Sequence, residues 1–135
     1  MVLVCCVDDR GGMAFHGRRQ SMDRVLRSDL LATAAGRPLW MSPYSAAQFS
    51  PQTSVSVSED FLDRAGPEEL CFVELCSPAP WLDRAEGLIL YRWNRTYPFD
   101  VALGFDPEKA GFFLTERTDF PGHSHPKLTK EVYQR

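Results

Sequence analysis

The chain has 135 residues, of which 44% are hydrophobic and 24% are charged. This composition is typical of a globular domain and excludes intrinsically disordered and fibrous classes. We expect one domain spanning residues 1–135, long enough to bury a single core. With a net charge of −3, the chain lacks the basic excess of a duplex-DNA-binding protein. RNA is kept as a candidate partner.

The amino-terminal segment carries no targeting signal of a familiar kind. Only seven apolar residues precede Asp8, and no basic region comes before them, so neither a secretory signal nor a membrane span is indicated. We therefore expect a cytoplasmic protein without membrane association. The four cysteines form no C-x-x-C pair, and no histidine stands at zinc-finger spacing, which predicts reduced, packed thiols.

The first predicted unit is a strand followed by a helix. Val2–Val7 is a continuous apolar run rich in β-branched residues, which predicts a strand buried on both faces. Ser21 is predicted to cap a helix over Met22–Ala35, with Asp23 in its first turn and Gly36 as its terminator. This arrangement is one β-loop-α unit.

A second strand-helix unit and several further strands follow. Pro38–Met41 is predicted as a strand, and Ser42 as the cap of a short helix from Pro43 to Phe49. Further strands are predicted at Thr53–Val57, Leu70–Leu75, Gly87–Trp93, Val101–Phe105 and Phe112–Thr115, with a brief helix beginning at Pro80. The tail Pro121–Arg135 stays open between helix and strand. Alternating strands and helices predict an α/β fold with a mostly parallel central sheet.

The order of these elements, and the residues at their ends, resembles the dihydrofolate reductase family over nearly the whole chain. Val4–Met13 is similar to the family's first strand and the mobile loop over its active site. Pro38–Ser45 resembles the family's strand that ends in methionine and the Gly-Arg-x-Thr turn after it, and Ser45 aligns with the threonine of that turn. Trp81–Leu90 is similar to the family's helix-to-strand segment. The resemblance implies a three-layer sandwich, a mostly parallel central sheet flanked by short helices, with a ligand-binding cleft.

Three positions depart from the family pattern at the cofactor. The family's two adjacent glycines let backbone amides approach the pyrophosphate of NADPH, but here Glu74 and Leu75 occupy those positions. Pro43 stands where the family has an arginine. A carboxylate facing a pyrophosphate is repulsive, so the NADPH phosphate-binding motif is missing and the cofactor is left unknown. Asp23 best matches the position of the family's proton-handling carboxylate, while Asp29 matches the residues that flank this carboxylate in the family.

Two polar segments are candidate ligand-binding sites. Arg18, Arg19, Gln20 and Ser21 precede the first predicted helix, where their donors and the helix amides could hold a phosphate or carboxylate. The alternative is a solvated loop plus a helix cap. Further along the chain, Arg92 and Asn94 flank a tryptophan, a combination suited to stacking a ring and contacting phosphate. The alternative there is a plain β-turn.

The histidines are candidate proton-transfer groups. His123 and His125 would diverge on a regular strand, and with His16 as the only other histidine a dinuclear metal site lacks ligands, so no metal is predicted. If the tail folds back over the cleft, these histidines could join Asp23 as catalytic acid or base. A Ser-His pair without an orienting acid nearby is weak evidence for a hydrolase.

Three functions follow from these features. The first is a divergent dihydrofolate-reductase-like protein that binds a pterin, a nucleotide or another phosphate-bearing small molecule, with NADPH-dependent reduction left open. The second is a small phosphodiesterase or ribonuclease in which arginines hold phosphate and a histidine moves the proton. The third is a non-catalytic interaction module. The oligomeric state is not predicted.

Overall fold

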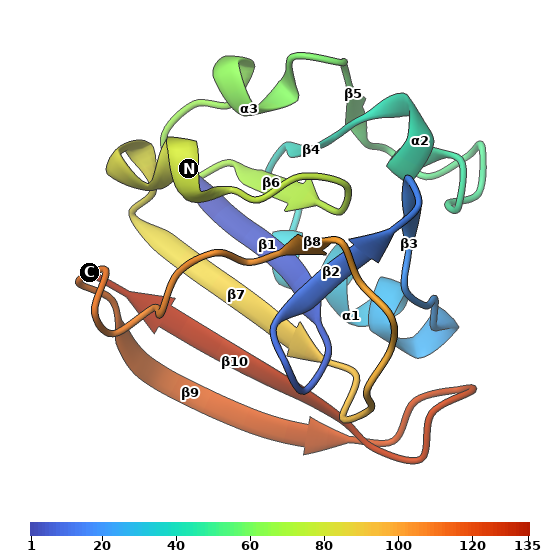
Figure 1. The fold of residues 1–135 in the computed structure, drawn as a ribbon. Helices are drawn as coiled ribbons and strands as arrows, with labels where there is room; N and C mark the ends of the chain where they lie inside the picture. The colour runs from blue at the N-terminus through green and yellow to red at the C-terminus, as the bar shows by residue number, and fades with distance from the viewer.

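A twisted seven-stranded sheet forms the centre of the molecule in the computed structural model, which describes residues 1–135 (Figure 1). The strand order is β5-β4-β6-β1-β7-β10-β9. The strands are β1 (Val2–Val7), β4 (Leu39–Met41), β5 (Ser56–Val57), β6 (Leu70–Val73), β7 (Gly87–Arg92), β9 (Phe113–Phe120) and β10 (Leu128–Gln134). Only the pairings made by β10, with β7 and with β9, are antiparallel, so the expected mostly parallel sheet is confirmed.

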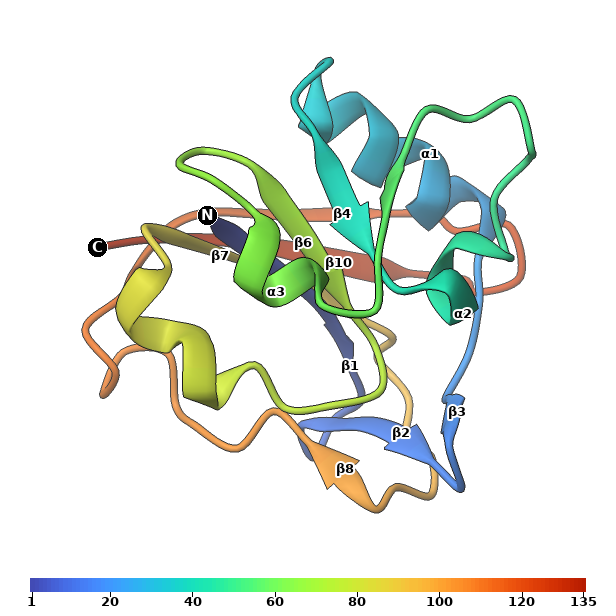
Figure 2. The same ribbon diagram turned by 90° about the horizontal axis from the view of Figure 1, so that it is seen from above.

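Helices cover both faces of this sheet and make three layers. Helix α1 (Arg24–Ala34) lies on one face, and α3 (Phe61–Arg64) with the 3-10 helix η1 (Ala79–Arg84) lies on the other (Figure 2). A fourth short helix, α2 (Pro43–Ala46), follows β4. The α/β sandwich flanked by short helices is therefore as expected. None of the helices combines the length and the apolar character needed to cross a bilayer.

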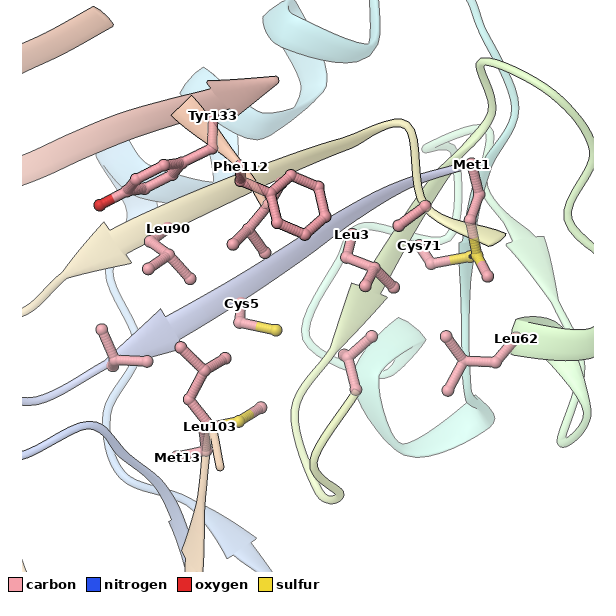
Figure 3. Packing of buried hydrophobic residues seen from close by; sticks show 14 of the residues in the cluster. Met1, Leu3, Cys5, Met13, Leu62, Cys71, Leu90, Leu103, Phe112 and Tyr133 are labelled. Atoms are coloured by element: carbon pink, nitrogen blue, oxygen red, sulfur yellow. The ribbon is translucent and has the colours of Figure 1, made fainter. Parts of the chain in front are cut away.

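Two hydrophobic clusters hold the layers together, one on each face. The cluster beneath α3 and η1 includes Leu3, Cys5, Leu90 and Phe112, all close to completely buried (Figure 3). The cluster beneath α1 contains Val4, Leu30, Phe72 and Tyr91, among others. Because β1 supplies alternate residues to both clusters, its continuous apolar run is explained: the strand is buried on both faces.

Helix α1 begins two residues later than predicted, and its cap is a different residue. Asp23, rather than Ser21, is the N-cap, and its carboxylate accepts hydrogen bonds from the backbone amides of Val25 and Leu26. The helix ends at Ala34, where Ala35 takes the left-handed conformation with φ of 51°. Serine and aspartate are both good N-caps, and the Asp23 carboxylate binds two amides of the tail loop in addition to those of the helix.

A second, three-stranded sheet lies across the end of β1 (Figure 1). It consists of β2 (Gly12–Phe15), β3 (Arg18–Arg19) and β8 (Val101–Ala102), in the order β3-β2-β8. The first two strands were expected to be loop, because short hairpins with a glycine-containing turn carry little periodic signal. The tail is a strand, β10, in its second half, which resolves the open alternative.

Four smaller expectations are corrected. The strands expected at Thr53–Val57 and Val101–Phe105 are only two residues long each, and β9 runs five residues beyond Thr115. Cys76 is exposed, whereas the other three cysteines are buried and all four are free thiols, so the expectation of packed thiols fails for Cys76.

Candidate functional site

The carboxyl ends of three neighbouring parallel strands meet at one edge of the sheet. Asp8 follows β1, Glu74 follows β6 and Trp93 follows β7, and the side chains of all three are buried. In open α/β sheets this edge, where the crossover connections leave in opposite directions, is the usual ligand-binding place. Strands β2 and β3 lie above it.

Side chains close the cleft between the ends of β1 and β6. Glu74 accepts a hydrogen bond from Arg19 Nε at 3.0 Å and another from Gln48 Nε2 at 2.9 Å. The Arg19 guanidinium also stacks over the ring of Tyr44, 4.3 Å from its centroid. The cavity left beside them has a volume of about 10 Å³. Arg19, which the sequence suggested as a phosphate ligand, thus neutralises the carboxylate of Glu74 instead.

Asp8 organises the loop that follows β1. Its carboxylate accepts hydrogen bonds from the backbone amides of Gly12 at 2.8 Å and Tyr97 at 3.0 Å, and from Gln20 Nε2 at 3.2 Å. Burial raises the pKa of Asp8, but these hydrogen bonds outweigh it, and the net result is a lowered pKa. The amide oxygen of Gln20 is buried without a hydrogen-bond partner.

Asp23 joins the tail to the start of α1. Besides the two helix amides, its carboxylate accepts hydrogen bonds from the backbone N–H groups of His123 at 3.0 Å and Ser124 at 2.9 Å. His125 Nδ1 lies 2.9 Å from Asp23 Oδ2. Burial raises the pKa of Asp23, but the hydrogen bonds, led by that of the His123 amide, lower it well below its usual value. The carboxylate therefore remains ionised.

His125 is held on three sides. Its Nδ1 faces Asp23, its ring stacks on the indole of Trp93 with centroids 4.8 Å apart, and its Nε2 lies 3.0 Å from Ser21 Oγ. The hydroxyl of Tyr97 lies 3.4 Å from the same Nε2. Because the ionised carboxylate can only accept, the proton of the neutral ring is assigned to Nδ1, which leaves Nε2 as an acceptor toward Ser21.

His123 points to a different place. It is exposed, and its Nδ1 lies 2.9 Å from a guanidinium nitrogen of Arg24. An open cavity of about 310 Å³ lies here, lined by Met22, Asp23, Arg24, Arg27, His123 and Ser124. The tail thus brings His125 inward to Ser21 and Asp23, while His123 stays at the surface.

The arginine and asparagine after β7 have structural partners. Arg92 Nε lies 2.6 Å from Glu131 Oε1, and Arg117 binds the other oxygen of the same carboxylate. Asn94 has a positive φ of 59° and donates to Thr129 Oγ1 at 2.9 Å. Arg92 also lines a cavity of about 390 Å³.

Ser45 and Arg18 lie outside these clusters. Ser45 is buried in α2, where it faces the capping Ser42. Arg18 is exposed on β3 and forms no side-chain hydrogen bond or ion pair. Since Arg19 faces Glu74, the segment from Arg18 to Ser21 does not present its donors together, and the amides at the start of α1 are taken by Asp23. No three His, Cys, Asp or Glu side chains converge as metal ligands.

Comparison with known proteins identifies the fold. No protein-family model and no curated protein matches the chain. Among solved structures, the chain is similar to a dihydrofolate reductase from Enterococcus faecalis complexed with NADP(H) and RAB-propyl. The match has a TM-score of 0.64 at 12% sequence identity and covers 99% of this chain and 95% of the other. The fold is that of dihydrofolate reductase.

Within this dihydrofolate-reductase-like fold, several residues of the edge were not singled out from the sequence. Arg10, Tyr97 and Glu131 are the main ones. Glu131 lies in a strand of mixed polarity, LTKEVYQ, so its burial had no sequence signal. The other two had none either, because their roles depend on contacts with residues far away in the chain.

Proposed function

We propose that the protein binds a phosphate-bearing small molecule, such as a nucleotide or a phosphorylated pterin, at the carboxyl edge of the sheet. The ligand would occupy the cavity of about 390 Å³ between the ends of β1 and β7 and the segment Ala102–Pro107. This volume falls in the range of small-molecule sites, roughly 300–1,000 Å³. The observation that carries the proposal is that two arginines, Arg10 and Arg92, line this cavity.

The charge balance of the cavity favours an anion. Arg10 donates to the backbone carbonyl of Tyr97 at 2.9 Å and forms no ion pair. Arg92 shares the single carboxylate of Glu131 with Arg117, so that cluster has one positive charge in excess. Asp106 also lines the cavity, but one of its carboxylate oxygens accepts from the amides of the turn that follows it. An arginine without a carboxylate partner is a ready donor to phosphate.

The wall of the cavity suits a flat ring. Val7, Leu90, Leu103 and Phe105 line it beside the arginines. Apolar walls with a few convergent polar groups are the usual composition of a small-molecule site. We propose binding and not NADPH-dependent reduction. A pyrophosphate would need free backbone amides at the turn after β6, and that turn carries Glu74, which is paired with Arg19.

Calorimetric titration tests this proposal, with inorganic phosphate, AMP, NADPH and folate as the probes. Arg10→Leu should weaken binding of the responsive phosphate-bearing probe about tenfold or more, the effect of one charge-assisted hydrogen bond. Arg95→Leu is the matched control, since it removes the same charge from an exposed position on the same edge. Absence of binding by every phosphate-bearing probe, or equal losses in the two variants, would contradict the proposal.

A second candidate, a phosphodiesterase or ribonuclease, is favoured by one observation. Arg24, Arg27 and His123 line the open cavity of about 310 Å³ at the start of α1. Two guanidinium groups could hold a phosphate there while the exposed imidazole moves a proton. Cleavage of single-stranded RNA that is lost in His123→Ala but kept in His16→Ala would support it. No cleavage by the native chain would exclude it.

A further inference from the structure

Ser21, His125 and Asp23 form an unbroken chain of hydrogen bonds. Ser21 Oγ lies 3.0 Å from His125 Nε2, and His125 Nδ1 lies 2.9 Å from Asp23 Oδ2. The histidine lies about one hundred positions along the chain from the other two residues, on the loop between β9 and β10. This is the connectivity of a nucleophile, a base and the acid that orients the base. The orienting acid that the sequence did not reveal is therefore Asp23.

We propose that Ser21, His125 and Asp23 are a serine-hydrolase triad that cleaves esters of short acyl groups. The proposal is independent of the anion site at Arg10 and Arg92. It is carried by the geometry of the three side chains and by the surroundings that hold each of them in place.

The base is fixed in one orientation. The His125 side chain is only 4% exposed, and the Trp93 indole stacks on its ring at an interplanar angle of 30°. Asp23 is fixed in turn by four backbone amides, two from α1 and two from the tail loop. Such fixed partners keep Nε2 directed at the serine and stabilise the imidazolium that forms when the ring takes a proton.

Ser21 supplies the nucleophile, and the Tyr97 hydroxyl supplies a donor for the oxyanion. Ser21 is partly exposed, as a nucleophile must be, and it lines the small cavity together with Cys6 and Trp93. Tyr97 places its hydroxyl 3.4 Å from the same Nε2, and we assign this hydroxyl as the donor to the developing oxyanion. The cavity of about 10 Å³ beside Ser21 has room for a group the size of one water molecule, such as the methyl group of an acetyl ester. We therefore assign an acetyl or formyl group as the acyl part of the substrate, with only its methyl group or hydrogen in this cavity.

The reaction has two balanced halves. In the first, Ser21 Oγ attacks the carbonyl carbon while His125 Nε2 takes the hydroxyl proton, and the Tyr97 hydroxyl donates to the oxyanion. The bond to the leaving alkoxide then breaks, and the imidazolium returns its proton to the alkoxide, which leaves an acyl-serine and an alcohol. In the second, His125 takes a proton from water as the water attacks the acyl-serine, and the imidazolium returns that proton to Ser21 Oγ as the acyl bond breaks, which releases the acid and restores Ser21.

Covalent labelling and ester hydrolysis test the triad directly. The whole chain is incubated with a fluorophosphonate, digested and analysed by mass spectrometry, and its turnover of p-nitrophenyl acetate is measured. We expect label on Ser21, and a loss of turnover of about 100-fold or more in Ser21→Ala, because members of a triad act as a unit. Ser28→Ala on the exposed side of α1 is the matched control and should keep both label and turnover.

His125→Asn separates chemistry from structure. Asparagine can still donate a hydrogen bond to Asp23, but it cannot act as a base. We expect this variant to lose the label on Ser21 while its unfolding midpoint stays close to that of the native chain. If it unfolds instead, the native chain and Ser21→Ala still decide the matter. No label on Ser21, or equal turnover in the native chain and Ser21→Ala, would overturn the proposal.

Discussion

Asp23 is the residue on which most of the edge depends. Its carboxylate caps α1, binds two amides of the tail and orients His125. Asp23→Ala removes a helix cap, worth about 1 kcal/mol, and leaves the His123 and Ser124 amides without an acceptor, at about 1–3 kcal/mol each. We expect a loss of about 3 kcal/mol or more in the free energy of unfolding, measured by urea denaturation at pH 7. A loss below about 1 kcal/mol would mean that the tail is held by other contacts.

The same carboxylate predicts a pH dependence with a definite sign. Burial raises the pKa of Asp23, but its hydrogen bonds outweigh that effect, so the folded-state pKa lies below the unfolded value of about 3.9. Its contribution to stability is therefore fully present above about pH 5 and is lost progressively as the pH falls below 4. The difference in unfolding free energy between the native chain and Asp23→Ala should shrink as the pH falls from 4 toward 2. A difference that grew over this range would contradict this account.

At the scale of elements, the loop between β9 and β10 makes the triad possible. Gly122 N donates to the His125 carbonyl at 2.9 Å, and a Cβ at Gly122 would lie 2.6 Å from Asp23 Oδ2. Gly122→Ala must therefore push the loop away from α1, at a cost of about 1–3 kcal/mol. We expect faster amide hydrogen exchange at residues 121–127. Gly66→Ala serves as the glycine control, because Gly66 has no positive φ and a Cβ there would make only van der Waals contact, 3.4 Å from Glu69 Oε1. Unchanged exchange in Gly122→Ala would show that the loop tolerates the extra methyl group.

Long elements with a clear pattern were predictable, and contacts between distant segments were not. β1, β6 and β7 were predicted closely because strands buried on both faces are continuous apolar runs. Capping by Ser42 was predicted correctly, since its signal lies within four residues. Ser21 and Asp23 are both suitable caps for the start of α1. Asp23 is the cap, and it also binds the tail loop about one hundred residues later in the chain. The triad and the Arg19–Glu74 pair depend on such contacts, for which the chain carries no local pattern.

At the scale of the whole molecule, the sheet divides the interior into two independent cores. One core packs beneath α1 and the other beneath α3 and η1, and side chains of successive β7 residues go to opposite faces. The dihydrofolate-reductase-like order of elements was visible in the sequence because each strand end has its own apolar and turn signals. The closure of the cleft was not visible, because it depends on one arginine reaching Glu74 from another sheet.

This division predicts that core substitutions on opposite faces are additive. Ile89→Val, beneath α1, should cost about 1 kcal/mol, and Phe112→Leu, in the other core, about 1–2 kcal/mol. The two side chains share no cluster, so the double variant should lose the sum within about 0.5 kcal/mol. Urea denaturation of the four proteins measures this double-mutant cycle. A coupling energy above about 1 kcal/mol would mean that strain passes through the sheet. In that event a ligand packed against Leu90 in one core could alter the side of the sheet that holds Trp93 and His125.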